Sequence, residues 1–146
     1  MAAPSNKPVD VANRLRPVLL HLSRHLRREV HASGVSPGQL SLLSAIEDKP
    51  GIGVAELAER EGTSMPSVSN HLDRLEASGL ITRRQGEHDR RRVDLEVTAE
   101  GIRVLKVIRT KRTAWLSARL NALTDVDLAA IATAIAPLEA LLVQAE

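Results

Sequence analysis

The segment Val54–Val97 constrains the fold of this chain most, because two short helical patterns are followed at once by two strand patterns. The first helical pattern ends at Gly62, a residue suited to a left-handed turn. The second begins near Ser64, whose side chain can cap a helix, and Pro66 is tolerated in its first turn. It ends at Gly79. The segment therefore predicts a helix, a tight turn and a second helix.

The second helix of this segment has two different faces. Val68, Leu72 and Leu75 recur at helical spacing, which predicts a stripe packed against a core. The other face carries short hydrogen-bonding side chains and one arginine, which suit contacts with base edges and phosphates of double-stranded DNA. The residues that we assign to this contact are Ser64, Pro66, Ser67, Ser69, Asn70 and Arg74.

The two strands predict a hairpin with a basic tip. Residues 80–84 and 92–97 form its strands, and Val93, Leu95 and Val97 alternate with polar residues, so we expect them to face inward. A helix-turn-helix followed by such a hairpin is a winged helix. A stretch of ten residues in the hairpin, 83–92, is strongly basic. It contains the arginines Arg83, Arg84, Arg90, Arg91 and Arg92 and only two acidic residues, Glu87 and Asp89. We assign Arg84, Asp89, Arg90 and Arg91 to DNA contact.

Further helices are predicted on both sides of this segment. They cover residues 9–32, 37–48, 99–122 and 125–145, and Ile52 is expected to add a short third strand beside the wing. The fold class is mainly α. A lobe of about 65 residues is too small to bury the apolar stripes of the three outer helices, which predicts a second copy of the chain as partner. We divide the chain into a flexible tail (1–8), a dimerisation helix (9–33), a winged helix-turn-helix DNA-binding lobe (34–98) and C-terminal dimerisation helices (99–146).

Several short motifs, in order and at matching spacing, resemble the DNA-binding lobe of MarR-family transcriptional regulators. They are the Glu-Leu-Ala of the first helix, the run Asp73–Arg83, the pair Asp89-x-Arg91 and the sequence Thr98–Gly101. The resemblance implies a homodimer joined through helices from both ends. It also implies that the Asp89 carboxylate holds the Arg91 guanidinium extended for the minor groove.

The resemblance covers nearly the whole chain, with departures in detail. Asn70 stands where many family members have arginine, whereas Arg74 matches an arginine that is widely shared. His71 replaces an apolar residue, and we expect it to be packed rather than reading bases. Gly86 and His88 stand where the family often has a further Asp and Arg, so the wing should either bind DNA less tightly or depend more on Arg90 and Arg92.

The resemblance further implies a small anionic or phenolic effector bound between the dimerisation helices and the lobe. The residues expected to line such a site are His21, Leu22, His25, Leu43, Ile108 and Arg112, with Leu40 beside Leu43. His21 and His25 are spaced to chelate a metal, but no third ligand is evident, so we predict no metal site and no cofactor.

Composition excludes several other functions. The chain has no cysteine, so disulfides, thiolate metal sites and cysteine redox switches are ruled out. No apolar run reaches the roughly 18 residues needed to span a bilayer, so we expect a cytoplasmic protein without membrane contact. No catalytic motif is present, so we do not expect an enzyme. The function predicted is a sequence-specific, homodimeric transcriptional regulator, a repressor on a pseudo-palindromic operator that an effector releases. The alternative is a winged-helix module that docks another protein.

Overall fold

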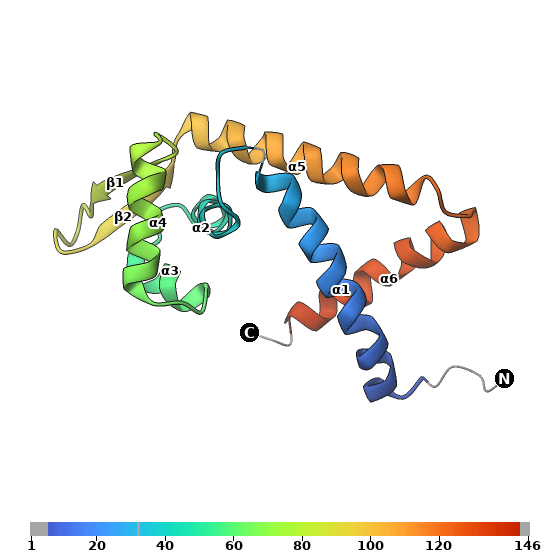
Figure 1. Cartoon of the computed structure of the whole chain (residues 1–146). Helices are drawn as coiled ribbons and strands as arrows, with labels where there is room; N and C mark the ends of the chain where they lie inside the picture. The colour runs from blue at the N-terminus through green and yellow to red at the C-terminus, as the bar shows by residue number, and fades with distance from the viewer. Residues whose placement is uncertain (1–5, 32, 144–146) are drawn as a thin grey trace. The chain divides into compact units, whose positions relative to one another are not determined.

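The computed structural model describes residues 6–31 and 33–143. Within these residues the elements, in order, are α1 (Pro8–His31), α2 (Pro37–Asp48), α3 (Val54–Arg60), α4 (Met65–Ala77), β1 (Ile81–Gln85), β2 (Val93–Val97), α5 (Ala99–Leu120) and α6 (Asp125–Val143) (Figure 1). The predicted mainly helical class is confirmed. The chain forms two compact units, one up to Thr110 and one from Lys111 onward.

The start of α2 shows how closely local chemistry sets the element boundaries. The Ser36 hydroxyl accepts a hydrogen bond from the backbone N–H of Gln39 (3.2 Å), and the Gln39 side chain accepts one from the Ser36 N–H (3.2 Å). Pro37 occupies the first helical position. This capping box satisfies two N–H groups that the helix cannot bond internally. The predicted helix over 37–48 therefore matches α2.

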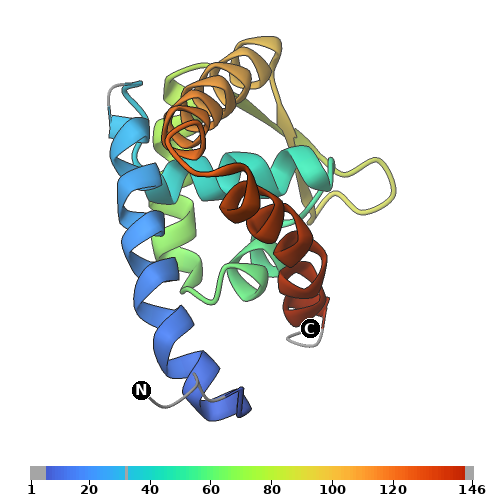
Figure 2. The same cartoon turned by 90° about the vertical axis from the view of Figure 1, so that its right-hand side faces the viewer.

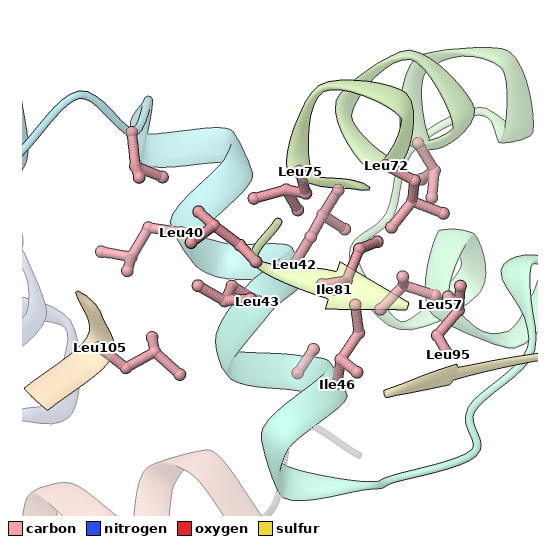
Figure 3. Close-up of a cluster of buried hydrophobic side chains, with 14 of the residues drawn as sticks. Leu40, Leu42, Leu43, Ile46, Leu57, Leu72, Leu75, Ile81, Leu95 and Leu105 are labelled. Atoms are coloured by element: carbon pink, nitrogen blue, oxygen red, sulfur yellow. The ribbon is translucent and has the colours of Figure 1, made fainter. Parts of the chain in front are cut away.

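The core of the first unit lies where α2, α3, α4, the sheet and the start of α5 meet (Figure 3). All of these elements contribute side chains with almost no exposed surface. Each such side chain contributes roughly 1.5–3 kcal/mol relative to leaving it in water. The largest of them are Leu43, Ile46, Leu57, Leu72, Leu75, Ile81, Leu95, Leu105 and Ile108.

The sheet is an antiparallel pair of strands that projects beyond the helices of the lobe as a hairpin (Figures 1 and 2). Ile52 forms a single isolated bridge with Leu95 beside the two-stranded sheet, so the residue lies where the sequence predicted it but a third strand does not form in the described part of the chain. Val93 departs from the predicted inward alternation, since 38% of it is exposed. It pairs with Gln85 at the last rung before the loop, where the hairpin has extended beyond the core.

The junction between the hairpin and α5 is tightly packed around Gly101. The Thr98 hydroxyl donates to the Gly79 carbonyl (2.6 Å) and accepts from the Gly101 N–H (3.1 Å), so it caps α5. A Cβ on Gly101 would lie 2.3 Å from the carbonyl oxygen of Leu80. Only glycine allows the helix to approach the start of β1 this closely.

The apolar face of α1 is largely exposed within the first unit. Val30, near its C-terminal end, is the one buried residue among those described in this helix. Exposed large apolar side chains follow the rest of α1; they include Val11, Val18, Leu19, Leu20 and Leu22. Residues 1–5 of the predicted flexible tail lie outside the described residues, and α1 begins at Pro8, inside the range given to that tail.

The second unit comprises the end of α5 and α6. The Arg119 guanidinium lies 3.6 Å from the centre of the Trp115 ring, a cation–π contact. No described residue of α6 is buried. This helix is long and apolar enough to cross a membrane by length and composition, with a mean hydropathy of 1.9. The expectation that no segment is long and apolar enough to span a bilayer was therefore wrong. Asp125, Asp127 and Glu139 interrupt the apolar run in the sequence, but α6 is still apolar on average.

Candidate nucleic-acid interface

One side of α4 fixes the helix to the lobe. Val68, Leu72 and Leu75 are fully buried, as their spacing predicted. The Ser64 hydroxyl accepts a hydrogen bond from the Ser67 N–H (3.3 Å), so Ser64 is the N-cap of α4. Pro66 stands in the first turn. The capping hydroxyl and the buried stripe together set the direction of the helix and the face that it presents.

The other side of α4 is open to a ligand. Pro66, Asn70 and Arg74 are exposed and follow one another at intervals of four residues, so they share a face. Ser67 and Ser69 are half-buried at its edges. Within the described residues, Arg74 takes part in no ion pair. This face combines an amide, hydroxyls and an arginine without a partner, which are groups that hydrogen-bond to base edges and phosphates.

The arginines of β1 have different roles. The Arg83 guanidinium lies 2.8 Å from Asp73 and 3.5 Å from Glu76, so it joins the strand to α4. Arg84 is on the opposite side of the strand, is 70% exposed and makes only a long contact of 3.6 Å with Glu96. Arg83 is therefore occupied by the fold, whereas Arg84 is available to a ligand.

The wing loop is ordered by its own backbone and by Asp89. An Asp89 carboxylate oxygen accepts a hydrogen bond from the Arg91 N–H (2.9 Å), and the Asp89 carbonyl accepts one from the Arg92 N–H (3.0 Å). Asp89 thus fixes the backbone of Arg91, and the direct pairing of carboxylate with guanidinium that the resemblance implied is absent from the described contacts. The Arg91 side chain is exposed and has no ion-pair partner in this part of the chain.

Two features of the wing were not foreseen from the sequence. Gly86 is buried, and a Cβ on it would lie 2.7 Å from the Asp89 carbonyl oxygen, so the loop has no room for a side chain there. Arg92 lies 3.1 Å from Asp94 and donates to the Gly51 carbonyl (3.3 Å), which ties the wing to the loop before α3. Because Arg92 is engaged internally, Arg90 and Arg91 are the wing arginines left for a ligand. Two signals in the sequence could have indicated these features: a glycine within a short loop, and an arginine two residues before an aspartate at the start of β2.

An open crevice of about 420 Å³ separates the start of α3 and the start of α4 from the wing. Met65, which is 50% exposed, and Val93 form apolar walls, and Arg91 lies at the same crevice. Glu56 also lines it, and a hydrogen bond from Lys49 is the main cause that lowers the pKa of Glu56. Sequence analysis did not single out Met65, because a lone methionine before the buried stripe gives no signal of an exposed apolar wall.

His71 is packed against the start of α2, in agreement with the expectation that it does not read bases. Its ring is so close to Gly38 that a Cβ there would lie 3.2 Å from Nε2. The Nδ1 atom is buried and has no hydrogen-bond partner. His71 therefore forms part of the contact between α4 and α2.

The residues expected to bind an effector do not meet in one open site within the first unit. Leu43 and Ile108 are buried in the core, whereas His21, Leu22 and His25 are exposed on α1. Arg112 belongs to the second unit, and burial lowers the pKa of its guanidinium. Among the described residues, no group of three or more His, Cys, Asp or Glu side chains is arranged to hold a metal ion.

The chain is similar to known transcriptional regulators in both sequence and structure. The chain matches a model of the MarR family over residues 35–93. It is 29% identical over 119 residues to the HTH-type transcriptional repressor MdtR of Bacillus subtilis, covering 82% of this chain and 77% of that protein. A crystal structure of a putative transcriptional regulator from Pseudomonas aeruginosa is 32% identical and has a TM-score of 0.78, covering 97% of this chain and 99% of that one. MepR of S. aureus bound to an oligodeoxyribonucleotide shares the fold, at a TM-score of 0.69 and 17% identity over 90% of this chain and 97% of that one.

Proposed function

Because the chain belongs to the MarR family of transcriptional regulators, which are DNA-binding proteins and not enzymes, we propose that it is a repressor that binds a pseudo-palindromic operator as a homodimer. One observation carries the DNA-binding part of this proposal. The exposed face of α4 and the tip of the wing hold arginines that pair with no carboxylate of residues 6–31 and 33–143, namely Arg74, Arg90 and Arg91. Their charge is therefore available for phosphates.

The two elements suit the two grooves of a duplex. A helix of the size of α4 fits the major groove, where Asn70 and Ser67 are chemically suited to base edges. A guanidinium on a narrow hairpin suits the minor groove, and Arg91 occupies that position in the wing. A structure of a MepR mutant, which shares the fold, is bound to an oligodeoxyribonucleotide. The repressor role is supported by the similarity to MdtR, which is a transcriptional repressor.

The homodimer is supported by apolar surface that each unit leaves exposed by itself. On α1 the exposed side chains include Val18 and Leu22, and on α6 they include Ile131, Ile135 and Leu142. Exposed stripes of this extent mark interaction surfaces. A twofold axis through such helices would place one α4 in each half-site, about one helical turn apart. Burial of α6 against the second copy would also explain why this helix is so apolar without a membrane. We therefore propose that the protein is cytoplasmic.

We further propose that a small anionic or phenolic effector releases the operator. The cationic Arg112 and the exposed His21 and His25 are the groups suited to such a ligand. Because Leu43 and Ile108 are in the core, they would contact the ligand only after a rearrangement of the helices around them. Such a rearrangement would change the separation of the two α4 helices in the dimer.

The test of DNA binding is fluorescence anisotropy of a labelled duplex, selected from a random pool, against a scrambled duplex of the same composition. The expected result is tighter binding to the selected duplex and a steep fall in affinity as salt rises. Equal affinity for both duplexes at every salt concentration would contradict specific binding. Absence of binding to either would favour a wing that docks protein.

A further inference from the structure

The DNA-binding lobe exposes few large apolar side chains. Between the start of α2 and the end of β2, all of which the structure describes, two are exposed: Met65 and Val93. The other exposed large apolar side chains lie on α1 or from α5 onward. Met65 and Val93 are far apart in the sequence, yet both line the open crevice of about 420 Å³ beside the wing. Single apolar residues scattered over a surface are ordinary, but two from separate elements around one hollow mark a candidate contact surface.

Met65 lies at the edge of the α4 face that is assigned to DNA. It is the first residue of the helix, directly after the Ser64 cap. Helical periodicity places Met65 and Ser69 along one edge of the face that carries Asn70, and Ser67 along the other edge. The Met65 edge is the one that faces the wing, because Met65 lines the crevice. Since the N-terminal residues of a recognition helix contact base edges, Met65 is in a position to meet a base.

The proposed placement of α4 and the wing determines which part of the duplex enters the crevice. With α4 in the major groove and the wing in the adjacent minor groove, the backbone of one strand passes between the two elements. The crevice lies between the same elements, and Arg91 lines its wing side. A thymine of that strand carries its C5-methyl group in the major groove, beside its own backbone. Such a methyl group would therefore reach the α4 side of the crevice, where Met65 lies.

The chemistry of the crevice suits an apolar group. Gly53, Val54 and Ala55 supply further walls without charge. Glu56 also lines the crevice, but its carboxylate pairs with Lys49, which offsets the negative charge. A methionine side chain is flexible and fills irregular gaps, so it can adapt to a methyl group that a more rigid side chain would miss. The second copy of the chain is a poorer occupant, because the apolar stripes assigned to it are on α1 and α6.

We propose that Met65 is a specificity-determining residue that contacts the C5-methyl group of one thymine in each half-site. This inference rests on the proposed DNA-binding function, and it adds a base contact made by packing to the hydrogen bonds expected of Asn70 and Ser67. Val93 forms the opposite wall and limits the access of water to the contact. Apolar contact with the thymine methyl group distinguishes base pairs in the major groove, so Met65 would select a T·A pair beside the wing.

The test replaces thymine by deoxyuridine in the selected duplex, one base at a time, which removes the methyl group and leaves base pairing and charge unchanged. Wild-type protein should bind about three- to fivefold more weakly when one particular thymine of a half-site is replaced, as expected for one buried methyl group. Replacing it in both half-sites should weaken binding about ten- to twentyfold. Met65→Ala should bind the thymine and uridine duplexes alike. Met65→Leu, which keeps an apolar side chain of similar volume, should retain most of the discrimination.

Ile102→Ala is the matched control, because Ile102 is also 50% exposed but lies on α5, and this variant should keep the full discrimination. Thermal unfolding and sedimentation of all variants check the fold and the oligomeric state. The proposal is overturned if no replacement weakens wild-type binding, or if Met65→Ala still discriminates thymine from uridine. A Met65→Ala dimer that dissociates more readily would also overturn it and assign the crevice to the second copy. Wild-type protein that bound no duplex would instead contradict the proposed function itself.

Discussion

At the scale of single residues, the fold decides which arginines are available to DNA. Arg83 and Arg92 are adjacent in sequence to exposed arginines, yet Arg83 joins β1 to α4 and Arg92 holds the wing to the loop at Gly51. Arg91, between Arg90 and Arg92, has its backbone fixed by Asp89 and its side chain exposed. The wing therefore presents Arg91 from an ordered loop, which reduces the entropy lost on binding.

Arg91→Ala is expected to weaken DNA binding by roughly 1–3 kcal/mol, as for a guanidinium that enters a groove, and to leave the thermal midpoint unchanged. Asp89→Ala should cause part of the same loss because it releases the Arg91 backbone. The two losses should be less than additive. Isothermal titration with the single and double variants measures this. Arg103→Ala, an exposed and paired arginine on α5, is the control and should bind as wild type does.

Gly101→Ala is expected to destabilise the protein, although alanine in place of glycine usually stabilises a helix interior. The added Cβ would lie 2.3 Å from the Leu80 carbonyl oxygen and 2.6 Å from Val97 Cγ1, so backbone must shift. Overpacking of this kind costs typically 1–3 kcal/mol. Urea denaturation measures the effect. Gly53→Ala, where a Cβ has nothing within 4 Å, is the control. A Gly101→Ala variant as stable as wild type would mean that α5 is packed less closely on β1.

Single residues also differ in how far their roles could be predicted from the sequence. The buried stripe of α4, the caps at Ser36 and Ser64 and the special turn at Gly62 follow from local chemistry, and all are present. The burial of Gly86 and the internal role of Arg92 depend on contacts between segments far apart or on the path of a loop. Spacing alone carries no information about such contacts.

At the scale of elements, α4 divides its two tasks between its faces. Its buried stripe fixes the helix in the lobe, and the exposed face at Asn70 and Arg74 is free of contacts that the fold needs. The first helices and the hairpin were predicted to within a few residues because each has a clear start or stop signal. The long outer helices were predicted in length, but their burial was not. Val30 of α1 and Leu105 and Ile108 of α5 reach the core, whereas most of α1 and all described residues of α6 do not.

Asn70→Ala is expected to change which bases are preferred more than it changes overall affinity. Asn pairs with adenine through two hydrogen bonds in the major groove, and loss of such a pair costs about 1–3 kcal/mol at that base pair alone. Competition among single-base variants of the selected duplex measures the change. Arg74→Ala, by contrast, should weaken all duplexes alike if it contacts phosphate. Uniform weakening by Asn70→Ala would contradict base reading at this position.

At the scale of the whole molecule, the exposed apolar surface of α1 and α6 is what the proposed dimer would cover. No described residue of α6 is buried, and Leu142 is 71% exposed. Replacing Leu138 and Leu142 by Asp should prevent dimerisation and yield unstable or aggregated protein, because the protomer cannot cover these stripes alone. Sedimentation equilibrium and thermal unfolding measure this outcome. A stable, soluble monomer from that variant would show that α6 has no role in assembly.

In the proposed dimer, two copies of α4 and of the wing read one duplex together. Selection of preferred sites from a pool of random duplex DNA, carried out in parallel with wild-type protein and Arg91→Ala, tests this most directly. Wild type should enrich a pseudo-palindrome whose half-site centres are roughly 10 base pairs apart, and Arg91→Ala should enrich it less strongly. Enrichment of only asymmetric or directly repeated sites, or of no site at all, would contradict the claim.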